Sequence, residues 1–253
     1  MKRPTKRRTA QGRLAWLDAY LIRQAPVELH QVHLIDVGFG LHPTTSLETL
    51  DALESWQASI IAVDTDASIV AAAKASLQTR GKRISFQVGD FRLSRSVPKN
   101  RTVGLIRCAN VLRGYREDEV EPAWYAMASV LSEGGVLMDA TCDAKGAVGS
   151  CLVLRKQGDR LVREALLFFS DFSRGFAPRM FRDVLPRIYR RRAKPGSPIA
   201  RFLDDWQHKI DALPACDVRS AFEASVLAHP EMHFIAEGLA QWAPSEGVPT
   251  ETS

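Results

Sequence analysis

The chain has 253 residues, of which 45% are hydrophobic and 25% are charged. This balance is typical of a globular protein, and the length suffices for one well-buried α/β domain with an accessory segment but not for two ordinary enzymes. The formal net charge of +5 is modest, but the positive charge gathers at residues 2–13 and 179–194. Such clusters can attract phosphate groups, although a solvated basic surface explains them more often.

The sequence gives no sign of a membrane segment or a metal site. No apolar run is long enough to cross a bilayer, and the basic start is not followed by the apolar stretch of a secretory signal. We therefore expect a cytoplasmic protein. The four cysteines show neither a CxxC pair nor metal-ligand spacing, so we expect reduced, mostly buried thiols and no metal at Cys108, Cys142, Cys151 and Cys216.

The first half of the chain alternates between helical and strand patterns. Residues 14–22 carry leucines and aromatic side chains at helical spacing, which predicts an amphipathic helix that ends before Pro26. Apolar runs then predict strands at 33–37, 59–63, 84–88, 103–108 and 135–140, with helices at 45–53, 67–77 and 117–131. Asp66 precedes one of these helices, where its side chain can accept hydrogen bonds from the first amide groups.

Five strands that alternate with helices imply a parallel sheet with helices on both faces. Right-handed crossovers put the loops after the strands along one edge of that sheet. After residue 143 the pattern changes, because residues 150–154 and 161–169 flank a turn at 156–159 and predict an antiparallel hairpin. Further helices are predicted at 199–213 and 221–227.

We therefore predict a doubly wound, mostly parallel seven-stranded α/β sheet of the Rossmann-like type, with a closing antiparallel hairpin and a C-terminal extension that is mostly helical. The expected divisions are a basic tail and N-terminal helix at 1–29, the core at 30–172, the extension at 173–243 and a disordered tail at 244–253.

Three acidic residues follow or end the first three predicted strands: Asp36, Asp64 and Asp90. Each alone is more often an ordinary turn residue. In a doubly wound sheet, however, these strand ends converge on the ligand crevice, so the spacing brings three carboxylates near one bound molecule. An acid after the second strand commonly binds a ribose diol, because both hydroxyls can donate to one carboxylate. Asp64 is the candidate for that role.

The loop after the first strand contains Gly38 and Gly40, which permit a tight turn and a close approach of the backbone to a ligand. Two glycines alone are weak evidence. Asp36 precedes them, and its charge would repel a dinucleotide pyrophosphate but suits a cationic ammonium or sulfonium group. The third glycine of the dinucleotide fingerprint is also missing, which makes a nicotinamide or flavin site the poorer interpretation.

Four segments together resemble the motifs of class I S-adenosylmethionine (SAM)-dependent methyltransferases. Residues 33–40 resemble the first motif, 61–64 the second, 88–91 the adenine-side motif and 105–112 the fourth-strand motif. The resemblance extends from residue 30 to residue 170. The end of the fourth-strand motif and the residues after it, from Asn110 to Tyr115, further resemble those of a group of uncharacterised bacterial methyltransferase-like proteins. This second resemblance implies no substrate.

The resemblance implies SAM as the cofactor. It implies that Asp36 and the glycine loop hold the methionine end, that Asp64 takes the ribose hydroxyls, and that Asp90 takes the adenine amino group. Asn110 would line the passage between cofactor and methyl acceptor. His42 and Pro43 stand where many members have a third glycine. The implied cofactor-binding residues are Asp36, Gly38, Phe39, Gly40, Asp64, Thr65, Asp90, Phe91 and Asn110.

Methyl transfer is an in-line displacement at a carbon that the sulfonium activates, so the enzyme mainly aligns acceptor and donor and needs one base or none. A histidine such as His42 is suited to proton removal, yet beside a proline turn it is more often structural. Tyr115 can hydrogen-bond an acceptor or pack on the next helix. Candidates facing the acceptor are His42, Asn110, Arg113, Tyr115 and Asp143. The sequence assigns none of them a role.

The acceptor class stays open between a small molecule and an RNA. The Asn-Pro-Pro-aromatic tetrad that marks amino-group methylation is absent, because Asn110 is followed by Val-Leu-Arg. The segment from Arg179 to Lys194 interleaves aromatic and basic residues, as RNA-contacting surfaces often do. The alternative is a basic connector whose Phe181, Leu185 and Ile188 pack on the core.

Two other functions are alternatives to a methyltransferase. One is a SAM-binding sensor or interaction protein that keeps the fold but has lost catalysis, which the altered glycine loop and the missing acceptor motif support. The other is a nucleotide-dependent oxidoreductase, which Asp36 disfavours. The sequence indicates neither the oligomeric state nor the pathway.

Overall fold

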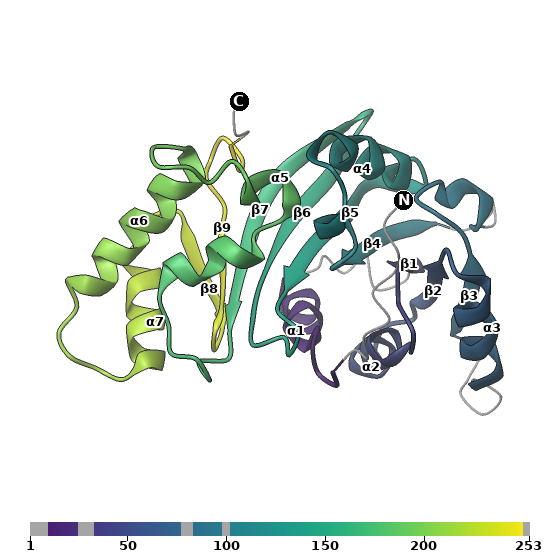
Figure 1. The fold of residues 1–253 in the computed structure, drawn as a ribbon, viewed down its shortest axis with the longest axis horizontal. Coiled ribbons are helices and arrows are strands. Elements are labelled where there is room, and N and C mark those ends of the chain that lie inside the picture. Colours follow the sequence, from purple (N-terminus) through teal and green to yellow (C-terminus); the bar gives the residue numbers. More distant parts are fainter. Residues whose placement is uncertain (1–9, 25–32, 77–82, 98–101, 250–253) are drawn as a thin grey trace.

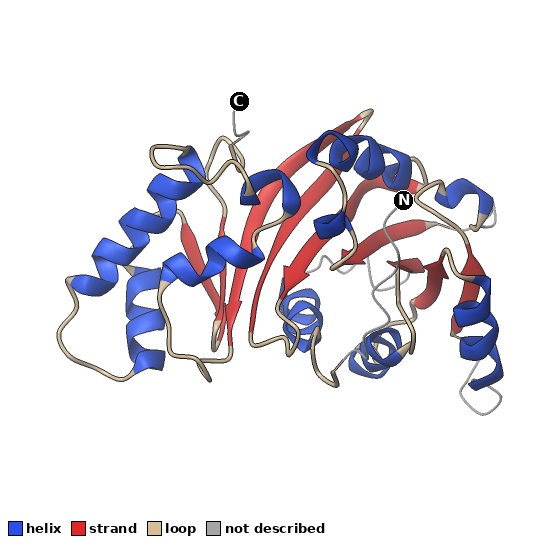
Figure 2. Ribbon diagram, in the orientation of Figure 1, coloured by secondary structure: helices blue, strands red, loops and turns tan. Residues whose placement is uncertain are grey.

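The computed structural model describes residues 10–24, 33–76, 83–97 and 102–249. These residues build one mixed sheet in the order β3-β2-β1-β4-β5-β6-β7-β9-β8, with helices on both faces (Figures 1 and 2). The predicted Rossmann-like α/β class is confirmed. The sheet has nine strands in the described ranges where the sequence predicts seven.

One half of the sheet consists of five parallel strands, as predicted. Apolar side chains bury these strands from both faces, and Ile35, Ile106 and Leu137 have no exposed surface. Because the strands are parallel, the loops after their carboxyl ends lie at the same edge of the sheet. The strands are β1 (His33–Val37), β2 (Ser59–Asp64), β3 (Ile84–Val88), β4 (Val103–Ala109) and β5 (Leu131–Cys142).

Helices α1 (Ala15–Gln24), α2 (Thr44–Ala52) and α3 (Ala67–Ser76) cover one face of this half, and α4 (Val120–Ala128) covers the other (Figure 1). Asp66 caps α3 as expected, because its Oδ1 accepts hydrogen bonds from the amides of Ser68 at 2.9 Å and Ile69 at 3.4 Å. The sheet thus has a separate apolar core on each face.

The other half of the sheet is antiparallel. The predicted hairpin is present as β6 (Val148–Gln157) and β7 (Arg160–Ser170), and β6 pairs directly with β5. A second hairpin of β8 (Met232–Ala236) and β9 (Leu239–Trp242) adds two strands that the sequence does not predict. Its two-residue turn ends at Gly238, whose φ of +71° suits glycine in a hairpin turn.

The C-terminal extension packs against the antiparallel half. It contains the 3-10 helix η5 (Pro178–Val184), α5 (Arg187–Arg190), α6 (Pro198–Asp211) and α7 (Val218–Leu227). These elements bury an aromatic cluster against β7, and Phe168 contacts the rings of Phe181, Phe202 and Trp206. The extension is therefore helical on one face of the sheet, as predicted, and also contributes β8 and β9 to the sheet itself.

The expectation of disorder after Pro244 is wrong for residues 244–249. Val248 is buried, its amide donates to the backbone oxygen of Arg163 at 2.9 Å, and the Tyr189 hydroxyl donates to the Pro249 oxygen at 3.2 Å. A polar composition suggested disorder, but backbone pairing with β7 and burial of one valine hold this segment in place. Residues 250–253 of the same prediction lie outside the described residues. None of the helices described is long and apolar enough to cross a membrane.

Candidate functional site

The glycine loop after β1 uses its two glycines differently. Gly38 has a φ of +73°, and a Cβ there would lie 2.5 Å from Val111 Cγ2 in the loop after β4. Gly40 has a φ of +78°, but a Cβ there would meet nothing within 4 Å. Packing within the protein therefore requires Gly38, whereas Gly40 leaves backbone open to a ligand. Phe39 points into the core, where its ring lies 5.1 Å from that of Phe86.

Asp64, at the end of β2, is fastened to this loop. Its Oδ2 accepts a hydrogen bond from the Gly40 amide at 3.1 Å, and its Oδ1 accepts one from the Asp66 amide at 3.1 Å. The carboxylate remains half-buried, and Thr65 beside it is exposed. The structure therefore brings together the predicted ribose carboxylate and the open glycine of the loop.

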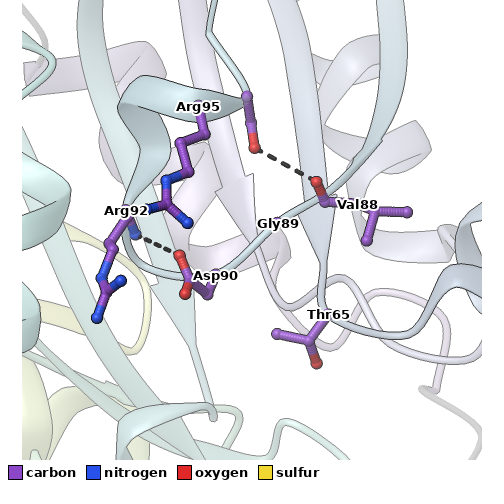
Figure 3. Close-up of a pocket in the computed structure, with 7 residues that line it drawn as sticks. Thr65, Val88, Gly89, Asp90, Arg92 and Arg95 are labelled. Carbon is purple, nitrogen blue, oxygen red and sulfur yellow. Dashed lines mark hydrogen bonds between the residues drawn. The ribbon is translucent and has the colours of Figure 1, made fainter.

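Asp90 lines a shallow pocket of about 330 Å³ at the ends of β2 and β3. Figure 3 shows Arg92 and Arg95 on one side of Asp90, with Thr65 and Val88 on the other. Asp90 is exposed, and its Oδ1 accepts a hydrogen bond from the Arg92 amide at 2.8 Å. The pocket coincides with the predicted adenine side, although its two arginines are not among the predicted site residues.

An aromatic pair lies near this pocket. The rings of Phe91 and Tyr115 are 5.3 Å apart, and burial raises the pKa of the Tyr115 hydroxyl, with a smaller contribution from Asp90. Tyr115 thus stands with the predicted adenine residues, not with the other candidates for the acceptor side.

Asp36 occupies a different environment from the one its predicted role requires. It is buried in β1, beside Arg107 in the neighbouring β4. Arg107 Nε donates to Oδ1 at 3.1 Å and Nη2 donates to Oδ2 at 2.8 Å, and the Ser46 hydroxyl also donates to Oδ2. Because a bidentate guanidinium balances its charge, Asp36 does not present a free carboxylate to a cationic ligand. The charge of Asp36 therefore does not favour a cationic sulfonium over a pyrophosphate at this loop.

Arg107 has a second acidic partner in α1. Its Nη1 lies 3.3 Å from Asp18 Oδ1, and Thr49 in α2 accepts from Arg107 and donates to Asp18. Burial opposes the positive charge of Arg107, but Asp36 and Asp18 raise its pKa. Burial also raises the pKa of Asp18 to about 6, against the effect of Arg107. Arg107 and Asp18 are absent from the predicted site, although an arginine within an apolar strand signals a buried acid nearby.

The loop after β4 is joined to the end of β5 through Asn110. This residue has a φ of +61°, its Oδ1 accepts from the Cys142 amide at 3.0 Å, and its Nδ2 donates to Cys142 Sγ at 3.2 Å. Arg113, in the 3-10 helix η3 (Leu112–Gly114), donates to the Cys142 oxygen at 2.9 Å. The structure therefore gathers Asn110, Arg113 and the neighbouring Asp143 at one point of the sheet edge.

Two candidates for the acceptor side differ in their surroundings. Asp143 Oδ1 accepts hydrogen bonds from three consecutive backbone amides, of which the shortest is 2.6 Å from Gly146. These bonds are those of a turn residue. His42 is exposed in the loop after β1, next to the buried Pro43. Its side chain makes no hydrogen bond or ion pair that would fix it toward a ligand within the described ranges.

The basic segment from Arg179 to Lys194 directs its aromatic side chains inward. Phe181 and Tyr189 have no exposed surface, and Leu185 and Ile188 are also buried. These apolar side chains therefore pack on the core, as expected for a basic connector, and they are unavailable to stack on bases. Contact with RNA stays a prediction that rests on the arginines alone.

Comparisons with known proteins agree with the parallel half of the fold. Residues 35–135 match the model of a protein family described as a methyltransferase domain. The match runs from β1 into β5 and confirms the class I methyltransferase resemblance for this segment. It covers less than half of the chain. A comparison with curated protein sequences gives no significant match.

Among solved structures, the chain is similar to a magnesium protoporphyrin IX methyltransferase from Synechocystis PCC 6803, with 17% identity and a TM-score of 0.40 over 51% of this chain and 54% of that one. It is also similar to a SAM-dependent methyltransferase from Clostridium acetobutylicum ATCC 824, with 16% identity and a TM-score of 0.39 over 61% of this chain and 64% of that one. The chain thus spans less than two thirds of either protein.

Proposed function

We propose that this protein is a SAM-dependent methyltransferase whose acceptor is a small molecule. The observation that carries the proposal is the joining of Asp64 to the open Gly40, at the strand ends of a segment that matches a methyltransferase domain. A carboxylate next to accessible backbone is suited to a nucleoside, because it can accept from both ribose hydroxyls while the loop lies against the sugar.

The residues fit the nucleoside end of SAM. Asp64 would hold the ribose, Asp90 would accept from the adenine amino group, and Phe91 with Tyr115 would flank the base. When bound, SAM supplies a methyl group on a sulfonium that leaves as a neutral thioether. The fit is poorer at the methionine end, because the Asp36 carboxylate is paired with Arg107 and does not offer a free charge to the cationic groups of SAM.

The residues of this chain would therefore act mainly by position. Asn110 holds the loop after β4 against β5, which fixes the wall between the cofactor and the acceptor. Gly38 lets that loop approach the glycine loop closely. Such rigid placement is the main requirement of an in-line displacement, since acceptor and methyl group must be aligned with water excluded.

Calorimetry with SAM tests the cofactor assignment. Replacing Asp64 by Asn should weaken SAM binding by about tenfold or more, because hydrogen bonds to a charged group contribute roughly 1.5–3 kcal/mol each. The matched control is Asp118→Asn, at an exposed acid that pairs with Arg116 on the surface. Equal SAM affinities for the Asp64 variant and the wild type would remove the ribose assignment, and tight NAD binding without a SAM response would refute the proposal.

A SAM-binding protein without catalysis is the second candidate. The specific observation in its favour is that the side chains of Asp36 and Asn110 are already engaged within the protein. Transfer of labelled methyl groups from SAM to acceptors in a metabolite extract separates the two. Tight SAM binding without transfer to any acceptor in the extract would support the second candidate.

A further inference from the structure

The carboxyl end of β5 has positive side chains around it that the proposed cofactor site does not use. Arg113 is half-buried there, where its Nη1 donates to the Cys142 oxygen at 2.9 Å and approaches Asn110 Oδ1 at 3.4 Å. These contacts fix one edge of the guanidinium and leave its other N–H groups for a further partner.

Two more arginines contact Asp143, the residue that follows Cys142. Arg13 Nε, from the segment before α1, donates to the Asp143 oxygen at 2.9 Å, and Arg174 Nη1 lies 3.4 Å from Asp143 Oδ2. Segments that are far apart in the sequence therefore direct positive charge to the same strand end, beside Asn110.

Arg190 adds a fourth charge from the C-terminal extension. It belongs to α5, which contacts η3, the helix that carries Arg113. Burial lowers the pKa of Arg113, and the charges of Arg190 and Arg13 lower it further. Arg190 is exposed, and its guanidinium makes no hydrogen bond or ion pair with any residue in the described ranges.

The negative charge at this point is too small to balance the arginines. The Asp143 carboxylate contacts one of the four, Arg174, through Oδ2, and its Oδ1 is already bound to the amides of Lys145, Gly146 and Ala147. Glu117, the acid near α5, pairs with Arg192. Like charges held close together repel one another, so an excess of arginines is stabilised by a bound anion.

We infer that the methyl acceptor carries an anionic group, a carboxylate or a phosphate, which Arg113 and Arg190 bind beside Asn110. This inference rests on the proposed methyltransferase function and names the chemical class of its acceptor. A guanidinium fits both anions well, because its parallel N–H groups match two of their oxygens. Arg13 is held by the Asp143 oxygen and adds its charge from the side of α1.

A small acceptor fits these observations better than an RNA. RNA recognition commonly uses aromatic side chains that stack on bases, and Phe181 and Tyr189 in the basic segment are fully buried. Arg113, Arg13 and Arg174 also contact Cys142 or Asp143 at one strand end, whereas a nucleic-acid backbone needs a track of positive charge along its length.

The test is a titration of the protein, saturated with S-adenosylhomocysteine, with inorganic phosphate, followed by the NMR signals of the arginine Nε–H groups. We expect the signals of Arg113 and Arg190 to shift, and Arg190→Gln to weaken phosphate binding by about tenfold, as for the loss of one charge-assisted pair. Arg179→Gln is the matched control, because Arg179 is exposed in the same extension but outside the cluster. Its phosphate affinity should equal that of the wild type.

Three outcomes would overturn the inference. The first is equal phosphate affinity for Arg190→Gln and the wild type. The second is competition between phosphate and SAM, which would assign the arginines to the methionine carboxylate. The third is tight binding of single-stranded RNA that falls steeply with salt and depends on Arg190, which would make the acceptor an RNA. If SAM does not bind at all, the proposed function fails, while the phosphate titration of the free protein still tests the cluster.

Discussion

Arg107 and Asp36 lie opposite each other on adjacent parallel strands, both buried, and form a bidentate ion pair in which Nη2 and Oδ2 are 2.8 Å apart. Aligned pairing of β1 with β4 puts the two side chains on the same face of the sheet. The first motif of the candidate site is therefore held by a charge from the fourth-strand motif.

Replacing Arg107 by Met should strongly destabilise the protein, because it leaves Asp36 and Asp18 buried without a cation. Breaking a buried ion pair from one side typically costs about 3–5 kcal/mol. Chemical denaturation measures this cost as a lower free energy of unfolding. Adding Asp36→Asn and Asp18→Asn to the same chain should recover most of the loss, and a triple variant no more stable than the single one would contradict the charge explanation.

The two glycines of the loop should respond differently to alanine. Gly38→Ala should cost about 2–4 kcal/mol of stability, since it combines a left-handed backbone with a clash against Val111. Gly40→Ala should cost only about 1–2 kcal/mol, because its Cβ meets open space. We expect the Gly40 variant to lose SAM affinity instead. Val111→Ala should rescue part of the stability of Gly38→Ala and none of that of Gly40→Ala, as thermal unfolding would show.

Asp139 should make stability depend on pH. Its Oδ2 accepts from Trp124 Nε1 at 3.0 Å, its buried Oδ1 has no partner among the described residues, and burial raises its pKa from 3.8 to about 7. Between these values the folded protein holds a proton that the unfolded chain has released, so stability falls as pH rises toward 7 and levels off above it. The fall from pH 5 to pH 7 should be about 2 kcal/mol.

Asp18 also has a raised pKa and lowers stability in the same direction as pH rises. The variant Asp139→Asn separates the contribution of Asp139 from that of Asp18. Denaturation curves at several pH values should show a smaller decline for the variant than for the wild type. Identical pH profiles for both proteins would rule out Asp139 as the cause.

The parallel half of the fold could be predicted from the sequence because each of its elements leaves a local signal. Apolar runs mark β1 to β5, and Asp66 marks the start of α3. The second hairpin is short, and its strands depend on pairing with β7, which no local pattern reveals. Residues 244–249 were missed for the same reason, because Val248 is held by pairing with the distant strand β7 and leaves no local signal.

The candidate site could likewise be predicted only where local motifs mark it. The sequence places Asp64 and Gly40 at the same strand edge, and the structure joins them. The role predicted for Asp36 assumed that its charge faces a ligand, and only the three-dimensional pairing with Arg107 shows what balances it. The positions of Arg13 and Arg190 near Arg113 depend on how both ends of the chain fold back, which motif spacing does not encode.

The contact between Asp18 and Arg107 also constrains which residues related sequences can carry at these positions. One member of the pair lies in α1, before the segment that matches a methyltransferase domain, and the other lies inside it. A lineage that lost the arginine while keeping both acids would bury the carboxylates of Asp18 and Asp36 without a cation. Among related sequences, an apolar residue at position 107 should therefore accompany uncharged residues at both position 18 and position 36.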